Sequence, residues 1–163
     1  MTSGNRSRMR QSSGAGVTRH APRRMATPIF AACGMWQVGL GLYFALLRPA
    51  LLPEDVRYMG ASLARVDVAL PGAASWLRHV FTVMGGFMVA SGVLTVFVAV
   101  TLVAERRKGT GLVMLLAGLA SVMSMSWTNF AIGSGSKWLL LGPALLWGLG
   151  VVAYALEAAT ARP

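Results

Sequence analysis

Long uncharged stretches alternate with short polar segments along this chain. The uncharged stretches are residues 25–47, 80–104, 109–136 and 138–156. About 20 apolar residues in a helix cross the hydrocarbon core of a bilayer, because each residue adds about 1.5 Å. The pattern therefore predicts an all-α protein, a bundle of four transmembrane helices at about residues 28–48, 80–103, 111–132 and 138–157.

The polar segment between the first two spans has a helical period of its own. Pro53, Glu54 and Asp55 suit the first turn of a helix, where proline fits and acidic side chains complement the helix dipole. Apolar residues then recur at spacings of three and four, at Val56, Met59, Leu63, Val66 and Leu70. This pattern predicts one amphipathic helix in the first outer loop. It is compatible with a ligand-gating lid and with a simple cover over the helix ends.

Composition supports the membrane assignment. Hydrophobic residues make up 55% of the 163 residues and charged residues only 12%, against about 25% charged in soluble domains. Residues 1–27 are rich in Ser, Gly and Arg, which predicts a disordered basic cytoplasmic tail. Residues 28–158 then form the transmembrane domain and residues 159–163 a second short cytoplasmic tail, which leaves no room for a separate soluble domain.

The basic residues give the bundle an orientation. The net charge is +10, six arginines precede the first span, and Arg106, Arg107 and Lys108 fill the turn between the second and third spans. Because Lys and Arg concentrate in cytoplasmic loops, both termini are expected on the cytoplasmic side of a cell membrane, which we expect to be a bacterial inner membrane. This distribution explains the high charge without nucleic-acid binding.

The tryptophans fit the same orientation. Trp76, Trp127 and Trp138 fall near the outer boundary of their spans, at the headgroup level that indole rings prefer. Trp36 and Trp147 lie close to mid-span instead. We therefore expect these two residues to pack between helices.

Small residues within the spans predict where the helices approach one another. Helices in lipid associate through close packing at small side chains and through hydrogen bonds rather than through hydrophobic burial. The candidate packing positions are Gly34 and Gly41 in the first span, Gly85, Gly86 and Gly92 in the second, Gly118 in the third, and Gly142 and Gly150 in the fourth.

A few polar side chains share one depth in the predicted bundle. Gln37, Ser91 and Ser121 lie near the centres of their spans, and Ser124 and Asn129 follow toward the outer boundary. Interhelical hydrogen bonding and a binding site for the polar group of a ligand are both compatible with such a cluster.

Several kinds of chemistry lack the residues they need. The uncharged stretches contain no acid or histidine for a proton relay. The only histidines are His20 in the tail and His79 at the edge of the second span, so one chain cannot hold a haem between two histidines. Met123 and Met125 point to different helix faces, which disfavours a copper site. We predict no cofactor, metal site or catalytic residue.

One group of titratable residues does lie near the outer surface. Glu54, Asp55 and Asp67 could meet His79 there, which is the one place where an enzyme active site could form. A solvated set of surface ion pairs is the alternative.

The loop and the start of the second span resemble known sequences. The stretch Leu-Leu-Arg-Pro-Ala-Leu-Leu-Pro-Glu-Asp-Val-Arg-Tyr-Met-Gly at 46–60, with Trp-Leu-Arg-His-Val-Phe at 76–81 and Val-Met-Gly-Gly at 83–86, resembles small bacterial four-helix membrane proteins. The layout is similar to that of the DoxX-like group. This resemblance implies a location and a fold, and it brings no functional residue with it.

Three functions are compatible with the sequence. The protein could be a structural or accessory protein that packs in the lipid bilayer against other membrane proteins or a second copy of itself. It could instead bind or carry a lipophilic ligand within the bundle, or act as an enzyme at the outer surface. The first requires the fewest special residues and is the leading expectation.

Overall fold

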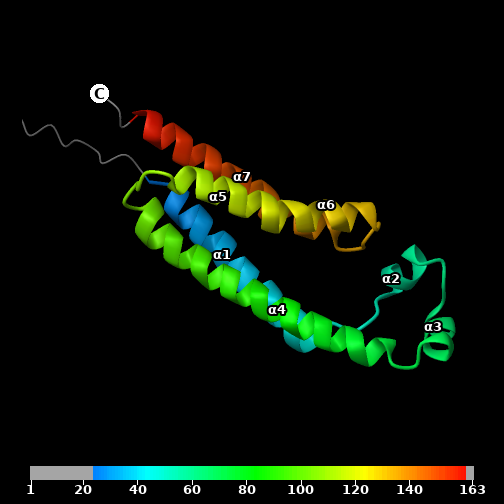
Figure 1. Cartoon of the computed structure of the whole chain (residues 1–163). Helices are drawn as coiled ribbons and strands as arrows, with labels where there is room; N and C mark the ends of the chain where they lie inside the picture. Colours follow the sequence, from blue (N-terminus) through cyan, green and yellow to red (C-terminus); the bar gives the residue numbers. More distant parts are fainter. Residues whose placement is uncertain (1–23, 161–163) are drawn as a thin grey trace, which may run out of the picture.

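Four helical spans form the framework of the molecule, whose computed structural model describes residues 24–160 (Figure 1). The first span joins α1 (Ala26–Leu42) to the π-helical turn η1 (Tyr43–Leu47), and the second joins α4 (Ala73–Val98) to η2 (Ala99–Val103). The third consists of α5 (Thr110–Gly118), η3 (Leu119–Met123) and α6 (Ser124–Ala131), and the fourth is α7 (Lys137–Thr160). Each span is long and apolar enough to cross a membrane, so the predicted all-α, four-helix class is confirmed.

The two predicted tails fall largely outside the described residues. This applies to residues 1–23 of the N-terminal tail and to residues 161–163 at the C-terminus. Within the described part, α1 already begins at Ala26 and α7 continues to Thr160.

The second span is longer than its uncharged stretch. We expected it to begin near residue 80, whereas α4 begins at Ala73. Arg78 and His79 lie on its first turns and are exposed. Charged and polar side chains can reach water from the end of a membrane helix, so the helix continues past the apolar stretch that revealed it.

The outer loop contains two short helices, where the spacing of its apolar residues predicts one. They are α2 (Pro53–Tyr58) and α3 (Leu63–Ala69). The chain breaks between them at Gly60, whose φ of +65° is a left-handed conformation that glycine adopts readily. Ser62 then starts α3, because its Oγ accepts a hydrogen bond from the Arg65 backbone N–H at 3.3 Å.

The spans are arranged as two hairpins (Figure 1). One consists of α1 and α4, the other of the α5–α6 span and α7, and α1 also packs against α7. The hairpins lie close together at the end that carries the Arg106 turn, which we call the basic end. They diverge toward the end that carries α2 and α3, which we call the loop end.

Two reciprocal glycine pairs hold α1 against α4. A Cβ built on Gly34 would lie 2.8 Å from the Gly92 carbonyl oxygen, and one on Gly92 would lie 2.6 Å from the Gly34 oxygen. Gly41 and Gly85 approach in the same way, at 2.7 Å and 2.5 Å. These distances leave no room for a side chain, so the two backbones are in direct contact at both levels.

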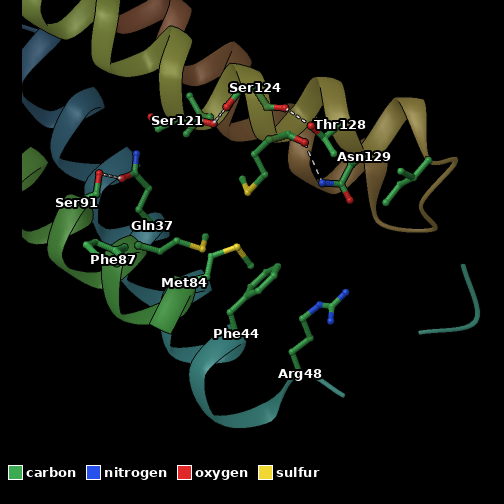
Figure 2. A pocket seen from close by; sticks show the side chains of 14 residues that line it. Gln37, Phe44, Arg48, Met84, Phe87, Ser91, Ser121, Ser124, Thr128 and Asn129 are labelled. Carbon is green, nitrogen blue, oxygen red and sulfur yellow. Dashed lines mark hydrogen bonds between the residues drawn. The ribbon is translucent and has the colours of Figure 1, made fainter. Parts of the chain in front are cut away.

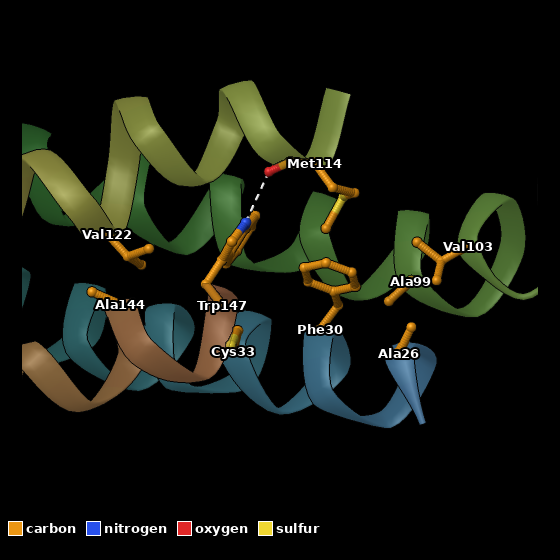
Figure 3. Close-up of a cluster of buried hydrophobic side chains, with 9 residues drawn as sticks. All are labelled: Ala26, Phe30, Cys33, Ala99, Val103, Met114, Val122, Ala144 and Trp147. Carbon is orange, nitrogen blue, oxygen red and sulfur yellow. Dashed lines mark hydrogen bonds between the residues drawn. The ribbon is translucent and has the colours of Figure 1, made fainter. Parts of the chain in front are cut away.

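The other helix contacts centre on the indole of Trp147 (Figure 3). This ring is 3% exposed, packs edge-on against Phe30 of α1 at 5.4 Å between centroids, and donates a 2.8 Å hydrogen bond to the Met114 carbonyl of α5. A Cβ on Gly118 would overlap the indole, and one on Gly150 would lie 2.9 Å from the Phe30 ring. Trp147 therefore joins α1, α5 and α7, as its mid-span position suggested.

Three of the expected packing residues lie on exposed helix faces. Gly86 and Gly142 are exposed, and a Cβ on either would meet no atom within 4 Å. Trp36 is 40% exposed on the outside of α1. Helical spacing alone places these residues near a packing face, but the two glycines and Trp36 lie on exposed faces of their helices.

A polar network ties the basic end together. The Glu157 carboxylate of α7 accepts hydrogen bonds from the Met25 and Ala26 backbone N–H groups at 2.6 and 3.1 Å, and its second oxygen pairs with Arg106 at 2.6 Å. Arg106 lies in the turn before α5, where its φ of +56° is a left-handed backbone conformation. This single carboxylate connects the start of α1, the turn before α5 and the end of α7.

Candidate ligand cavity

A cavity of about 470 Å³ lies between the two hairpins (Figure 2). All five residues of the polar cluster expected from the sequence line it, namely Gln37, Ser91, Ser121, Ser124 and Asn129. Much of the remaining wall is apolar and includes Phe44, Met84, Phe87, Met88, Met125 and Ile132. Its volume is within the range of small-molecule sites, and the methionines give the wall an adaptable surface.

The core forms the inner end of this cavity. Val122 belongs both to the cavity wall and to the buried cluster that contains Trp147 and Ala144. On the side, Phe87 is 72% exposed, and Ser124 and Thr128 on the facing helix are also exposed. The cavity is therefore closed toward the basic end and open laterally between α4 and α6.

Gln37 is the most buried polar group in the cavity. Its side chain is 4% exposed, and its Oε1 accepts a 3.1 Å hydrogen bond from the Ser91 hydroxyl of α4. Its Nε2 has no hydrogen-bond partner among the described residues. Figure 2 shows the amide oxygen toward Ser91 and this nitrogen on the other side of the amide, where almost none of its surface is accessible.

The polar side chains of the facing wall donate hydrogen bonds within their own helix. Ser121, Ser124 and Thr128 donate to backbone carbonyls one turn back, at 2.6, 2.7 and 2.9 Å, and Asn129 donates to the Met125 carbonyl at 2.9 Å. The expected cluster is thus divided: Gln37 and Ser91 bond each other, and the other three residues face them across the cavity. Ser121 lies within the π-helical turn η3, a geometry that recurs at functional sites.

Arg48 forms the outer end of the cavity and was not singled out from the sequence. It pairs with Asp55 of α2 at 3.1 Å, and its guanidinium lies 3.7 Å from the Phe81 ring centroid and 5.4 Å from that of Phe44. The Arg48 side chain is 9% exposed. The available signal was an arginine directly after an apolar span and before Pro49, which placed it at the outer boundary without indicating its partners.

A second cavity of about 320 Å³ adjoins the first. Phe44, Arg48, Asn129 and Ile132 line both. The second cavity also includes Glu54 and Asp55, which belong to α2. The two cavities therefore share a boundary beneath the outer loop.

Helix α2 is attached to both hairpins above these cavities. Asp55 holds it to Arg48 of the first hairpin. Glu54 accepts a 3.3 Å hydrogen bond from Ser134, and Arg57 donates to the Gly133 carbonyl at 3.0 Å, both in the turn between α6 and α7. This helix bridges the diverging ends of the bundle.

Glu54, Asp55 and His79 of the outer loop do not form a common site. Asp55 and Glu54 bond Arg48 and Ser134, whereas His79 Nδ1 lies 2.8 Å from the Ser75 carbonyl of its own helix. The residues that an outer-surface active site would need thus have separate partners.

Comparison of the chain with protein-family models, with curated proteins and with solved structures finds no match. The similarity to DoxX-like proteins therefore stays a prediction from the sequence.

Proposed function

We propose that the protein binds or carries a lipophilic molecule in the cavity between its two hairpins. The observation that supports this function is a cavity of about 470 Å³ with a largely apolar wall and a few polar groups at defined positions. Ligand sites usually combine these two features. The lateral opening between α4 and α6 lies within the predicted hydrocarbon layer, so a ligand could enter directly from the bilayer.

A small molecule fits this cavity better than a partner helix does. A transmembrane helix needs the full thickness of the bilayer, about 30 Å. The cavity instead ends at mid-depth, where Val122 and the Trp147 core fill the space between the hairpins, and α2 lies above its outer end.

The ligand that co-purifies with the protein tests this function. Ser121→Trp would place an indole in the cavity, whereas Ala117→Trp alters an exposed residue one turn away that does not line it. We expect mass spectrometry of organic extracts to find a lipophilic compound enriched on the wild type and on Ala117→Trp, and depleted on Ser121→Trp. Equal extracts from all three proteins would contradict the proposal.

We also propose that the protein lies in a bacterial inner membrane with its basic end in the cytoplasm. The positions of Arg106, Arg107 and Lys108 support this orientation. A reporter that is active only outside the cytoplasm should give signal when fused after Gly135 and none when fused after Lys108. The reverse pattern would invert the assignment.

An accessory role in a larger membrane assembly is the second candidate. Thr82, Gly86 and Ala90 form an exposed stripe at a spacing of four on α4, and nothing in the chain lies within 4 Å of a Cβ on Gly86. Small residues at such spacing are typical of helix–helix interfaces in membranes. A photo-crosslinker at position 86 should then give one reproducible product that the same crosslinker at exposed Gly39 of α1 does not give.

A further inference from the structure

The amide of Gln37 indicates which lipophilic molecules the cavity would take. We propose that the ligand is an uncharged lipophilic carbonyl compound whose oxygen accepts a hydrogen bond from Gln37 Nε2. This inference rests on the proposed function. Gln37 is then a specificity-determining residue.

The first step concerns the unused hydrogen-bond donor. Gln37 is 4% exposed, and its Nε2 has no partner among the described residues, whereas its Oε1 is occupied by Ser91. A buried donor without an acceptor is unfavourable, because it has lost its water and gained nothing in return. Because almost no surface of this nitrogen is accessible, a ligand carbonyl oxygen would satisfy it by displacing the atoms that now cover it.

The second step concerns the other polar groups of the wall. The Ser121 and Ser124 hydroxyls donate to their own helix, and the Asn129 amide, toward the outer end, uses one of its two N–H groups in the same way. At the inner end of the cavity, Gln37 Nε2 is therefore the described side-chain donor left for a ligand. An acceptor on the inserted end of the molecule matches this arrangement.

The third step concerns charge. The charged side chain that lines this cavity is Arg48, which is already paired with Asp55 at 3.1 Å. Arg48 follows Gln37 by 11 residues in the sequence, so it lies about 16 Å further along the helix at 1.5 Å per residue. Gln37 is thus close to the bilayer midplane, where a charged ligand group would be strongly unfavourable. A neutral carbonyl group can accept a hydrogen bond from Gln37 and brings no charge to the midplane.

Two matched probes test the inference. 2-Tridecanone and tetradecane have the same number of non-hydrogen atoms and differ in the carbonyl. Their apparent affinities can be obtained from the rise in unfolding temperature of the protein in lipid nanodiscs as the mole fraction of each probe increases. We expect the wild type to bind the ketone roughly five- to tenfold more tightly than the Gln37→Met variant does. Tetradecane should bind the two proteins equally.

Ser91→Ala is the matched control, because it removes the partner of Oε1 and leaves Nε2 in place. It should keep the preference for the ketone. If Gln37→Met does not fold, the infrared band of 2-tridecanone labelled with ¹³C at the carbonyl replaces the variant. The band should move to lower wavenumber on the wild type relative to the same lipid without protein, as expected for a hydrogen-bonded carbonyl.

The outcomes separate this inference from the proposed function. If both probes stabilise the wild type and Gln37→Met alike, the cavity binds lipophilic molecules but the role of Gln37 is wrong. An unshifted infrared band from bound ketone would overturn it in the same way. If neither probe stabilises the wild type at any mole fraction, the proposed function fails as well.

Discussion

The indole of Trp147 occupies the space beside Gly118 that a side chain would otherwise fill. Any Cβ at Gly118 would overlap this ring, and the ring's N–H donates to the Met114 carbonyl one turn earlier in the same helix. The fit joins α7 to α5 at the level where the cavity ends. It therefore fixes both the packing of the second hairpin and the inner boundary of the candidate site.

Gly118→Val is expected to destabilise the protein by about 1–3 kcal/mol, because the valine must displace a buried indole or separate the two helices. Gly142→Val is the control, since a Cβ there meets nothing within 4 Å. Unfolding in detergent micelles, followed by tryptophan fluorescence, measures both. Equal stabilities of the two variants would contradict the observed packing.

Neighbouring glycines of α4 provide a second and sharper comparison. A Cβ on Gly85 would lie 2.5 Å from the Gly41 oxygen, whereas one on Gly86 would meet no atom within 4 Å. We expect Gly85→Ile to separate α1 from α4 and to lower the unfolding temperature strongly. Gly86→Ile should leave the unfolding temperature of the monomer nearly unchanged, because the two positions are about 100° apart around the helix. Similar losses from both substitutions would show that α4 is rotated relative to the structure.

The same glycines explain how far the sequence could predict the fold. The number of spans follows from the bilayer, which requires about 20 apolar residues per helix and so marks each span clearly. The apolar stretches do not show how each helix is rotated about its axis, and so which of its faces packs against a neighbour. Gly85 and Gly86 are chemically identical in the sequence, and only the position of α1 distinguishes the packed one from the exposed one.

The outer loop shows a different limit. Apolar residues from Val56 to Leu70 keep a helical spacing across the break at Gly60, so their period predicted one helix. The glycine and the capping residue Ser62 were the local signals for two helices. Periodicity reports which residues face the same way, and two helices in sequence can satisfy it as well as one.

The sequence predicted the depth at which the polar residues of the candidate site lie in the membrane, but it did not predict the cavity between the hairpins. Gln37 and Ser91 share a level because both lie near the middle of their spans, and their hydrogen bond follows from the contact between α1 and α4. The cavity exists because the two hairpins diverge toward the loop end, a tertiary feature that no local pattern encodes. For the same reason, the partners of Arg48 could not be read from the residues around it.

The attachment of α2 to both hairpins predicts control of access from the outer side. Arg57→Ala would remove the 3.0 Å hydrogen bond to the Gly133 carbonyl. We expect it to increase the rate at which a water-soluble maleimide modifies a cysteine introduced as Asn129→Cys, since Asn129 lines both cavities. The background should carry Cys33→Ala, because Cys33 is the one cysteine of the chain.

Arg65→Ala is the matched control for this experiment. Arg65 is exposed on α3, and its described hydrogen bond uses the backbone N–H and not the side chain. Its substitution should leave the labelling rate at the wild-type value. If Arg57→Ala and Arg65→Ala have the same effect, the helix merely covers the surface and does not limit access.

The carboxylate of Glu157 should matter far more for stability than that of Glu105. Glu157 is 15% exposed, accepts from two backbone N–H groups at the start of α1 and pairs with Arg106, which is 21% exposed. Glu105 and its partner Arg107 are 57% and 67% exposed. Charge-assisted hydrogen bonds of partly buried groups contribute about 1.5–3 kcal/mol, whereas exposed ion pairs contribute about 0–1 kcal/mol.

Glu157→Ala is therefore expected to lower the free energy of unfolding by about 2 kcal/mol, and Glu105→Ala by less than about 1 kcal/mol. The loss should be local as well as global, because the Met25 and Ala26 N–H groups lose their acceptor. Hydrogen exchange should accordingly accelerate at the first turn of α1 in Glu157→Ala and not in Glu105→Ala. Unchanged exchange at this turn, together with an unchanged free energy of unfolding, would mean that the start of α1 is held by its apolar contacts alone.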